Sequence, residues 1–202
     1  INLHGSLLPK YRGAAPINWA VINGEQETGV TTFRLQHQID TGNILLQSSF
    51  PIGPDETAGE IHDRMMIIGA GVLVQTIKKI AGGELQDQPQ PVVPDAPHAP
   101  KIFTETCRID WSHGLDRVYN LVRGLSPYPG AFTHLGGKVC KILKASKDLA
   151  AHELEPGTYH TDGKTFLKFV APGGYLNILE LQVEGKRKMH VAEFLRGFRP
   201  GA

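Results

Sequence analysis

The fold of the first half of the chain is decided by Ile1-Asn2-Leu3-His4-Gly5-Ser6-Leu7-Leu8-Pro9. Apolar residues at positions 1 and 3 alternate with Asn2 and His4, and this period of two predicts a short strand with both polar side chains on one face. Gly5 ends the strand, so Asn2 and His4 lie near its carboxyl end. Active sites of open α/β sheets gather at that edge. The stretch therefore predicts an α/β fold with a polar site where the first strand ends.

Outward from this strand, the sequence predicts two helices and two further strands. Proline at the first helical position and an Asn-Gly pair at the end favour a helix over 16–22. Alternating and β-branched residues favour strands over 30–35 and 44–50, with Asp40 in the loop between them. An apolar stripe at helical spacing, closed by two glycines, favours a long helix over 57–81. Residues 1–85 are thus expected to form one α/β domain.

A proline-rich segment, residues 86–102, is expected to be an extended linker. Five prolines fall within 88–100, and such a run is unsuited to a helix or to the interior of a sheet. A second domain over 103–202 is expected to follow. Ser112 is predicted to cap a helix that ends near residue 125, and another short helix is predicted near the chain end. Between the two helices lie short apolar runs separated by glycine turns, which favour a small barrel or sandwich, at 131–135, 139–145, 166–170 and 176–183.

Composition is typical of a globular protein that can bury a core, with 41% hydrophobic and 20% charged residues. No apolar run approaches the length of a membrane span, and no basic-then-apolar leader is seen. Cys107 and Cys140 lack metal-ligand spacing and are expected to be free thiols. Charge is uneven: residues 1–100 hold 6 Lys and Arg against 10 Asp and Glu, whereas residues 101–202 hold 15 against 10. The basic second half permits binding of a polyanion.

The polar residues at the strand end suit transfer of an acyl group to an amine. That reaction needs a donor to the developing oxyanion and a group that manages a proton. The amide of Asn2 can donate to the oxyanion, His4 titrates near neutrality, and Asp40 can orient and charge the imidazole. Each residue also has a simpler interpretation, since a strand-end histidine is often only hydrogen-bonded and an Asp before Thr-Gly often forms a turn. The residues alone leave both interpretations open.

Three segments add a family resemblance: Asn2-x-His4-Gly5-Ser6-Leu7-Leu8-Pro9, Tyr11-Arg12-Gly13-Ala14-Ala15-Pro16-Ile17 and Asp40-Thr41-Gly42. Together they resemble the signature of the folate-dependent formyltransferases, including the thirty-six positions from His4 to Asp40. The resemblance implies that Asn2, His4 and Asp40 form a catalytic triad and that 10-formyltetrahydrofolate is the formyl donor. It also implies folate contacts from Ser6, Leu7, Leu8, Pro9, Leu35, Gln36, His37, Gln38 and Ile39.

Within this family, Gly5 after the histidine resembles the branch that formylates the methionine carried by initiator tRNA. The resemblance continues beyond the proline-rich segment, for example at Pro127-Tyr128-Pro129-Gly130-Ala131. It implies the C-terminal half of a Rossmann-like formyltransferase domain followed by an OB-like small barrel domain that helps to hold tRNA. The N-terminal half of the catalytic domain is expected to be missing. Candidate contacts to the nucleic acid are Arg12, Lys186, Arg187 and Lys188.

Two alternatives remain beside this interpretation. The first is a nucleotide-amino-sugar formyltransferase, which shares the triad. The second is that the chain as it stands is a non-catalytic RNA-binding fragment. The partners expected from the resemblance are initiator methionyl-tRNA and the folate donor. A cytoplasmic monomer without a metal and without a membrane partner is expected.

Overall fold

The computed structural model describes residues 1–198, and the chain divides into two compact units, Ile1–Ile102 and Phe103–Ala202. The division assigns the proline-rich segment to the first unit. The proposed functional boundaries at 85 and 103 stay a prediction. Across the described residues, no helix combines the length and the apolar character that crossing a bilayer requires.

The first unit is built on a three-stranded sheet in the order β1-β3-β4, formed by β1 (Asn2–His4), β3 (Glu27–Phe33) and β4 (Ile44–Pro51). All three strands pair antiparallel, and the register sets His4 of β1 opposite Thr31 of β3. The loop between β3 and β4 is too short for a parallel crossover, which explains their antiparallel pairing. The predicted strands are confirmed, and the first of them ends at His4, immediately before Gly5.

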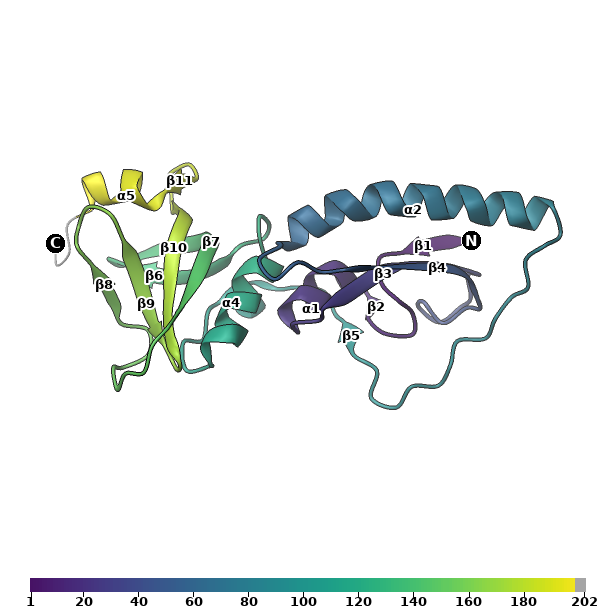
Figure 1. Ribbon diagram of the computed structural model, residues 1–202, viewed down its shortest axis with the longest axis horizontal. Coiled ribbons are helices and arrows are strands. Elements are labelled where there is room, and N and C mark those ends of the chain that lie inside the picture. The colour runs from purple at the N-terminus through teal and green to yellow at the C-terminus, as the bar shows by residue number, and fades with distance from the viewer. Residues whose placement is uncertain (199–202) are drawn as a thin grey trace. The chain divides into compact units, whose positions relative to one another are not determined.

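Two helices complete the α/β layer, α1 (Pro16–Ile22) and α2 (Ala58–Ala81). Both lie where the sequence predicts them. The helix α2 begins at a capping box, in which the Thr57 hydroxyl accepts from the Glu60 N–H and the Glu60 carboxylate accepts from the Thr57 N–H. Figure 1 shows α2 lying along β3 and β4. Its buried side chains Ile61 and Met65 belong to the core of this unit, and Gly82 ends the helix.

The proline-rich segment runs from the end of α2 to the loop that follows β1 (Figure 1). Its strand β5 (His98–Ala99) pairs in parallel with β2 (Arg12–Gly13). Earlier in the segment, the backbone of Gln88 pairs with that of Ile44, the first residue of β4. The segment is extended, and its backbone is hydrogen-bonded to the first unit at both ends.

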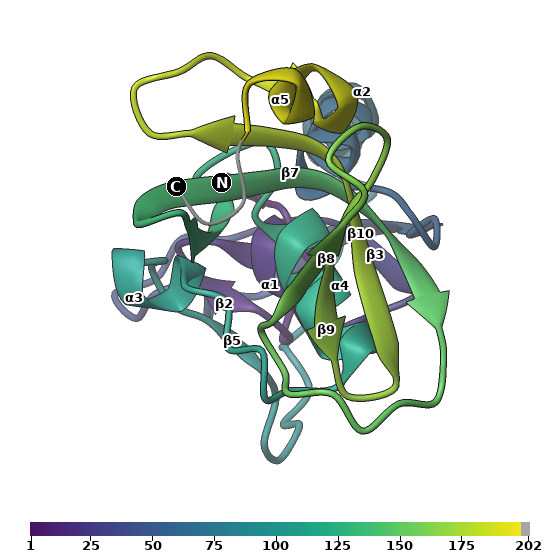
Figure 2. The ribbon, with the colours of Figure 1, turned by 90° about the vertical axis from the view of Figure 1, so that its left-hand side faces the viewer.

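The second unit carries one curved sheet in the order β6-β7-β10-β9-β8, with β11 paired to β10. Figure 2 shows the curvature of this sheet around α4. Within residues 103–198 no ladder joins β6 to β8, so the expected barrel is seen there as an open, half-closed sheet. Its elements are α3 (Thr104–Cys107), α4 (Leu115–Gly124), β6 (Ala131–Leu135), β7 (Lys138–Leu149), β8 (Tyr159–Thr161), β9 (Leu167–Ala171), β10 (Gly174–Val183), β11 (Met189–His190) and α5 (Val191–Gly197).

The four strands predicted for this unit are confirmed, and β8 and β11 are additional. The two extra strands are only three and two residues long, too short to show an alternating pattern. The predicted helix cap at Ser112 is wrong, because α4 begins at Leu115 after Gly114. The Ser112 hydroxyl instead donates to the carboxylate of Asp110, which lies two residues earlier, and so stabilises a turn that precedes the helix.

Cys107 and Cys140 are free, as predicted, and both are buried. Burial raises the pKa of the Cys140 thiol from 9.0 to about 12. Between these pH values the unfolded chain has lost the thiol proton and the folded chain retains it. We therefore expect the free energy of unfolding to fall as pH rises through this window, by roughly 1.4 kcal/mol per pH unit. Urea unfolding followed at several alkaline pH values should show a shallower fall for Cys140→Ala, and equal slopes would contradict the assignment.

Candidate active site

His4 is held rigidly at the carboxyl end of β1. Its side chain is buried, and the ring lies edge-on to Phe33 with centroids 6.4 Å apart. Nε2 lies 2.8 Å from the backbone oxygen of Tyr11. Because a carbonyl oxygen only accepts, Nε2 must be the protonated nitrogen of this hydrogen bond. The nitrogen left for exchange of a proton is therefore Nδ1.

The Tyr11 loop that binds Nε2 is itself anchored by its side chain. The Tyr11 hydroxyl donates to the Glu25 carboxylate at 2.8 Å and accepts from the Asn23 amide at 3.2 Å. Burial is the main cause that raises the pKa of this phenol above its usual value, and the neighbouring Glu25 adds to it. The phenol thus stays protonated and keeps its donor to Glu25. This anchoring fixes the carbonyl that orients His4.

Asp40 approaches His4 from the loop between β3 and β4. Its backbone has a φ of +56°, the left-handed conformation that Asp tolerates better than most residues. The carboxylate oxygen Oδ2 lies 3.6 Å from His4 Nδ1 and accepts a hydrogen bond of 2.9 Å from the Gly13 N–H. The side chains of His4 and Asp40 are only 8% and 11% exposed. The structure therefore brings together two of the three residues expected in the triad.

The geometry of the His4–Asp40 pair suits Nδ1 of His4 as a proton donor. With Nε2 protonated, uptake of a proton at Nδ1 gives an imidazolium opposite the carboxylate, and burial strengthens this attraction relative to water. The separation of 3.6 Å is an ion-pair distance but exceeds that of a hydrogen bond. The Nδ1 proton can therefore also be offered to a third group that enters beside the carboxylate.

Asn2, the third expected member, lies two residues before His4 in β1 and so on the same face of the strand. It is exposed. Its amide oxygen accepts from the Leu3 N–H at 2.9 Å. That contact uses the oxygen and leaves the amide nitrogen, the group needed as an oxyanion donor, out of the bond.

The first set of predicted folate contacts, residues 6–9, follows the first strand. Ser6 and Leu8 are buried: the Ser6 hydroxyl donates to the Lys10 carbonyl, and the Leu8 N–H donates to the Thr31 hydroxyl. Leu7 and Pro9 are partly exposed. The side chains of Ser6 and Leu8 therefore support the loop from within, and any contact to a ligand in this stretch must come from other atoms of the loop.

The second set of predicted folate contacts, residues 35–39, lies in the loop between β3 and β4. All five residues are exposed, and the apolar Leu35 and Ile39 are 65% and 75% exposed. They are followed directly by Asp40. Exposed apolar side chains beside the buried His4–Asp40 pair have the character of a ligand-binding edge. The members of the set are Leu35, Gln36, His37, Gln38 and Ile39.

The sequence prediction missed Gln90. Its amide nitrogen donates to the backbone oxygens of Asp40 and Gly42, at 2.7 and 2.8 Å. Its amide oxygen accepts from Nε and Nη2 of Arg12, at 3.1 and 2.5 Å. Arg12, predicted to contact nucleic acid, is thus engaged within the protein. A glutamine between two prolines carries no sequence signal of such contacts.

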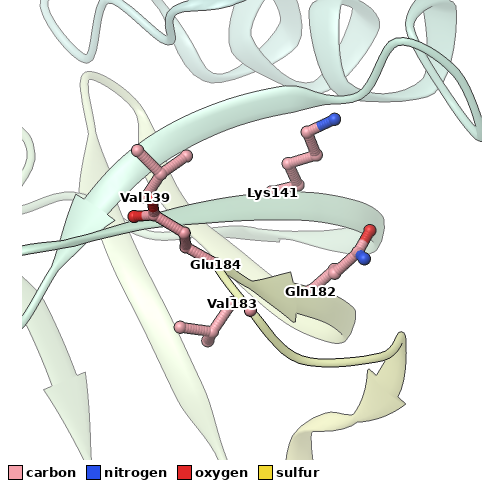
Figure 3. A pocket seen from close by; sticks show the side chains of 6 residues that line it. Val139, Lys141, Gln182, Val183 and Glu184 are labelled. Carbon is pink, nitrogen blue, oxygen red and sulfur yellow. The ribbon is translucent and has the colours of Figure 1, made fainter.

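The predicted basic turn, Lys186 to Lys188, is exposed in the second unit. Arg187 pairs with Glu193 at 2.5 Å and Lys188 with Glu180 at 2.6 Å, so two of the three cations already face an acid. Just before the turn lies a hollow of about 240 Å³ (Figure 3). It is lined by Val139, Lys141, Gln182, Val183, Glu184 and Gly185.

Comparison with known proteins links the geometry to a family. The family model described as "Formyl transferase" matches residues 1–77, and the one described as "Formyl transferase, C-terminal domain" matches residues 101–199. A curated protein of Phocaeicola vulgatus, "Methionyl-tRNA formyltransferase", is 47% identical over 98% of the chain. The chain spans 64% of the length of that relative.

Two solved structures show the same fold at lower identity. HypX from Aquifex aeolicus is 21% identical with a TM-score of 0.74, and the match covers 99% of this chain and 36% of HypX. An N-formyltransferase from Helicobacter canadensis, in complex with folinic acid and dTDP-3-aminofucose, is 20% identical with a TM-score of 0.71. That match covers 93% of this chain and 65% of the other. At these identities the likeness concerns the fold alone.

Proposed function

The chain belongs to the formyl transferase family, and we propose that it takes part in transfer of a formyl group from 10-formyltetrahydrofolate to the α-amine of methionine on initiator tRNA. The proposal depends on one observation above all, the buried His4–Asp40 pair at the end of β1. It is supported by the 47% identity to a relative named for that activity. The reaction forms a bond between the amine nitrogen and the formyl carbon and breaks the bond from that carbon to the folate nitrogen.

In this proposal His4 and Asp40 manage charge and protons. As the amine adds, negative charge develops on the formyl oxygen, and an Nδ1–H of His4 aimed at it stabilises that charge. The Asp40 carboxylate orients the imidazole and faces the positive charge that forms when Nδ1 takes up a proton. The amine must lose a proton and the departing folate nitrogen must gain one, and His4 is the titratable group placed to relay it. No covalent attachment to the chain is needed, since the amine is the nucleophile.

Asn2 is proposed as the second donor to the formyl oxygen. Its position on the same face as His4 is suitable, and its amide requires no change of protonation. In the present structure its amide oxygen is bonded to the neighbouring N–H, so the amide nitrogen remains the group that would face a substrate.

The residues beside the pair fit a folate donor. Bound 10-formyltetrahydrofolate supplies the activated formyl group. Apolar side chains at Leu35 and Ile39 suit the flat pterin ring, and the backbone groups of residues 36–38 suit its polar edge. The buried Ser6 and Leu8 act by holding the opposite loop in place.

For the tRNA, we propose that the second unit adds phosphate contacts through Lys186, Arg187 and Lys188. The ion pairs to Glu193 and Glu180 reduce what Arg187 and Lys188 can contribute. Arg12 is proposed as a further contact to the tRNA, and its bonds to Gln90 through Nε and Nη2 reduce what it can contribute. The curved sheet is proposed to act as an OB-like module of a cytoplasmic, monomeric enzyme.

The test offers 10-formyltetrahydrofolate with either initiator methionyl-tRNA or a nucleotide-linked amino sugar as the acceptor. It is run on the chain alone and on the chain fused to the segment of the Phocaeicola vulgatus relative that the match does not cover. We expect the fusion to formylate the tRNA and not the sugar. Formylation of the sugar alone would replace the proposal by the sugar-modifying alternative. Failure of both forms on both acceptors, with tRNA binding retained, would favour the RNA-binding alternative.

A further inference from the structure

The proline-rich segment contacts both loops that form the His4–Asp40 pair. On the His4 side, its Pro97 and Ala99 carbonyls accept from the backbone N–H groups of Tyr11 and Ala14, at 2.6 and 2.7 Å. The Tyr11 carbonyl in turn binds the His4 ring. The segment thus fixes the loop that orients the imidazole.

On the Asp40 side, Asp87 of the segment pairs with Arg34 at the start of the loop, and Gln90 contacts the turn at Asp40 itself. The amide nitrogen of Gln90 has two hydrogens, and the structure places the carbonyls of Asp40 and Gly42 to receive them. The first carbonyl belongs to the residue whose carboxylate faces His4, and the second lies two residues later in the same turn. Holding both therefore fixes the left-handed turn at Asp40, and with it the direction of the side chain.

The amide oxygen of Gln90 is fixed just as firmly. Both lone pairs face the guanidinium of Arg12, through Nε and Nη2. Arg12 precedes Gly13, whose N–H donates to the Asp40 carboxylate. Pro91 restricts the backbone of Gln90 to extended conformations, so the side chain starts from a fixed position. Gln90 thus connects the two sides of the pair by four hydrogen bonds.

We propose that Gln90 is a positioning residue that holds the Asp40 carboxylate beside His4, and this inference rests on the proposed function. Gln90 touches neither substrate in the proposal. It acts through Asp40, by preventing the turn from relaxing and the carboxylate from leaving the Gly13 N–H. A glutamate at this position has the same size but an ionised carboxylate cannot donate a hydrogen bond. Its anionic oxygen would face the carbonyl oxygens of Asp40 and Gly42.

The first experiment tests the position of the Asp40 carboxylate and does not depend on catalytic activity. Hydrogen exchange of the Gly13 amide, which is protected by the Asp40 carboxylate, is measured in the chain as it stands, for Gln90→Glu and for the control Gln88→Glu. Gln88 lies in the same segment, and its side chain is exposed. We expect Gly13 to exchange about tenfold faster in Gln90→Glu and unchanged in the control. Exchange of the buried Val72 amide in α2 serves as a reference for intact folding.

The second experiment is a kinetic cycle in whichever form is active on methionyl-tRNA. Gln90→Glu should lower kcat by about tenfold or more with little change in the KM values, because a displaced carboxylate affects the reacting geometry and not substrate binding. In the background of Asp40→Asn, the same substitution should cost less than about twofold, because residues that act as a unit are not additive.

Each outcome decides one part. Unchanged exchange at Gly13 in Gln90→Glu, with Val72 still protected, overturns the positioning role. Equal losses of kcat in the wild-type and Asp40→Asn backgrounds show that Gln90 acts by another route and also overturn it. Should wild type be inactive on methionyl-tRNA while Gly13 exchange changes as expected, the proposed function fails and the positioning of Asp40 by Gln90 stands.

Discussion

We expect Asp40→Asn to lower kcat for the proposed formyl transfer by about a hundredfold or more, with KM values changed far less. The substitution keeps the size of the side chain, and an amide oxygen can still accept from the Gly13 N–H. What disappears is the negative charge 3.6 Å from His4 Nδ1. Without it the imidazolium loses its partner in a buried site, and the ring is no longer held ready to donate to the formyl oxygen.

The measurement is steady-state transfer to methionyl-tRNA with both substrates varied. Asp95→Asn is the matched control, because Asp95 has the same φ of +56° but lies exposed in the proline-rich segment. Asparagine tolerates that conformation, so neither variant should be strained by its backbone. If kcat of Asp40→Asn stays within a few-fold of that of Asp95→Asn, the charge on residue 40 has no role in the chemical step.

Local signals in the sequence were sufficient to predict most of the elements. The helix α2 is marked by a capping box at one end and a glycine pair at the other, and α1 by proline at its first position. Such signals act within one turn of the helix, so they survive any tertiary arrangement. The strand ending at His4 follows in the same way from the alternation of four residues.

Part of the site could be expected and part could not. The closeness of His4 and Asp40 was predicted from loop placement and from resemblance, and the structure shows it. The role of Gln90 depends on a segment fifty positions later in the chain folding back onto the Asp40 loop. Nothing near Gln90 encodes that contact, since flanking prolines indicate only an extended backbone. Partners so distant in sequence are chosen by tertiary packing.

The failed cap at Ser112 has a similar cause on a smaller scale. Serine favours both helix caps and turns, because its hydroxyl bonds nearby backbone or side-chain groups in either case. Asp110, two residues earlier, offers the closer acceptor, and the helix then starts after Gly114. Competition between two local partners is decided by geometry that residue type alone does not specify.

Gly42→Ala should destabilise the first unit by about 3 kcal/mol, at the upper end of what overpacking costs. A Cβ at this position would lie 1.6 Å from the backbone oxygen of Arg34 and 2.7 Å from its carbonyl carbon. Both are backbone atoms of the chain continuing from β3, so no side-chain rotation relieves the overlap. The chain must move at Arg34 or at residue 42, and the carbonyl of residue 42 is one of the two held by Gln90.

The loss of stability should therefore be accompanied by displacement of Asp40. Gly71→Ala is the matched control: it lies exposed in the middle of α2 with open space where a Cβ would be, so alanine should stabilise the helix by up to about 1 kcal/mol. Urea unfolding gives both free energies of unfolding, and Gly13 exchange reports on Asp40 in the folded fraction. A free energy of unfolding for Gly42→Ala equal to that of wild type would mean that the Arg34 carbonyl moves aside at no cost, and that the Asp40 loop is less constrained than its hydrogen bonds indicate.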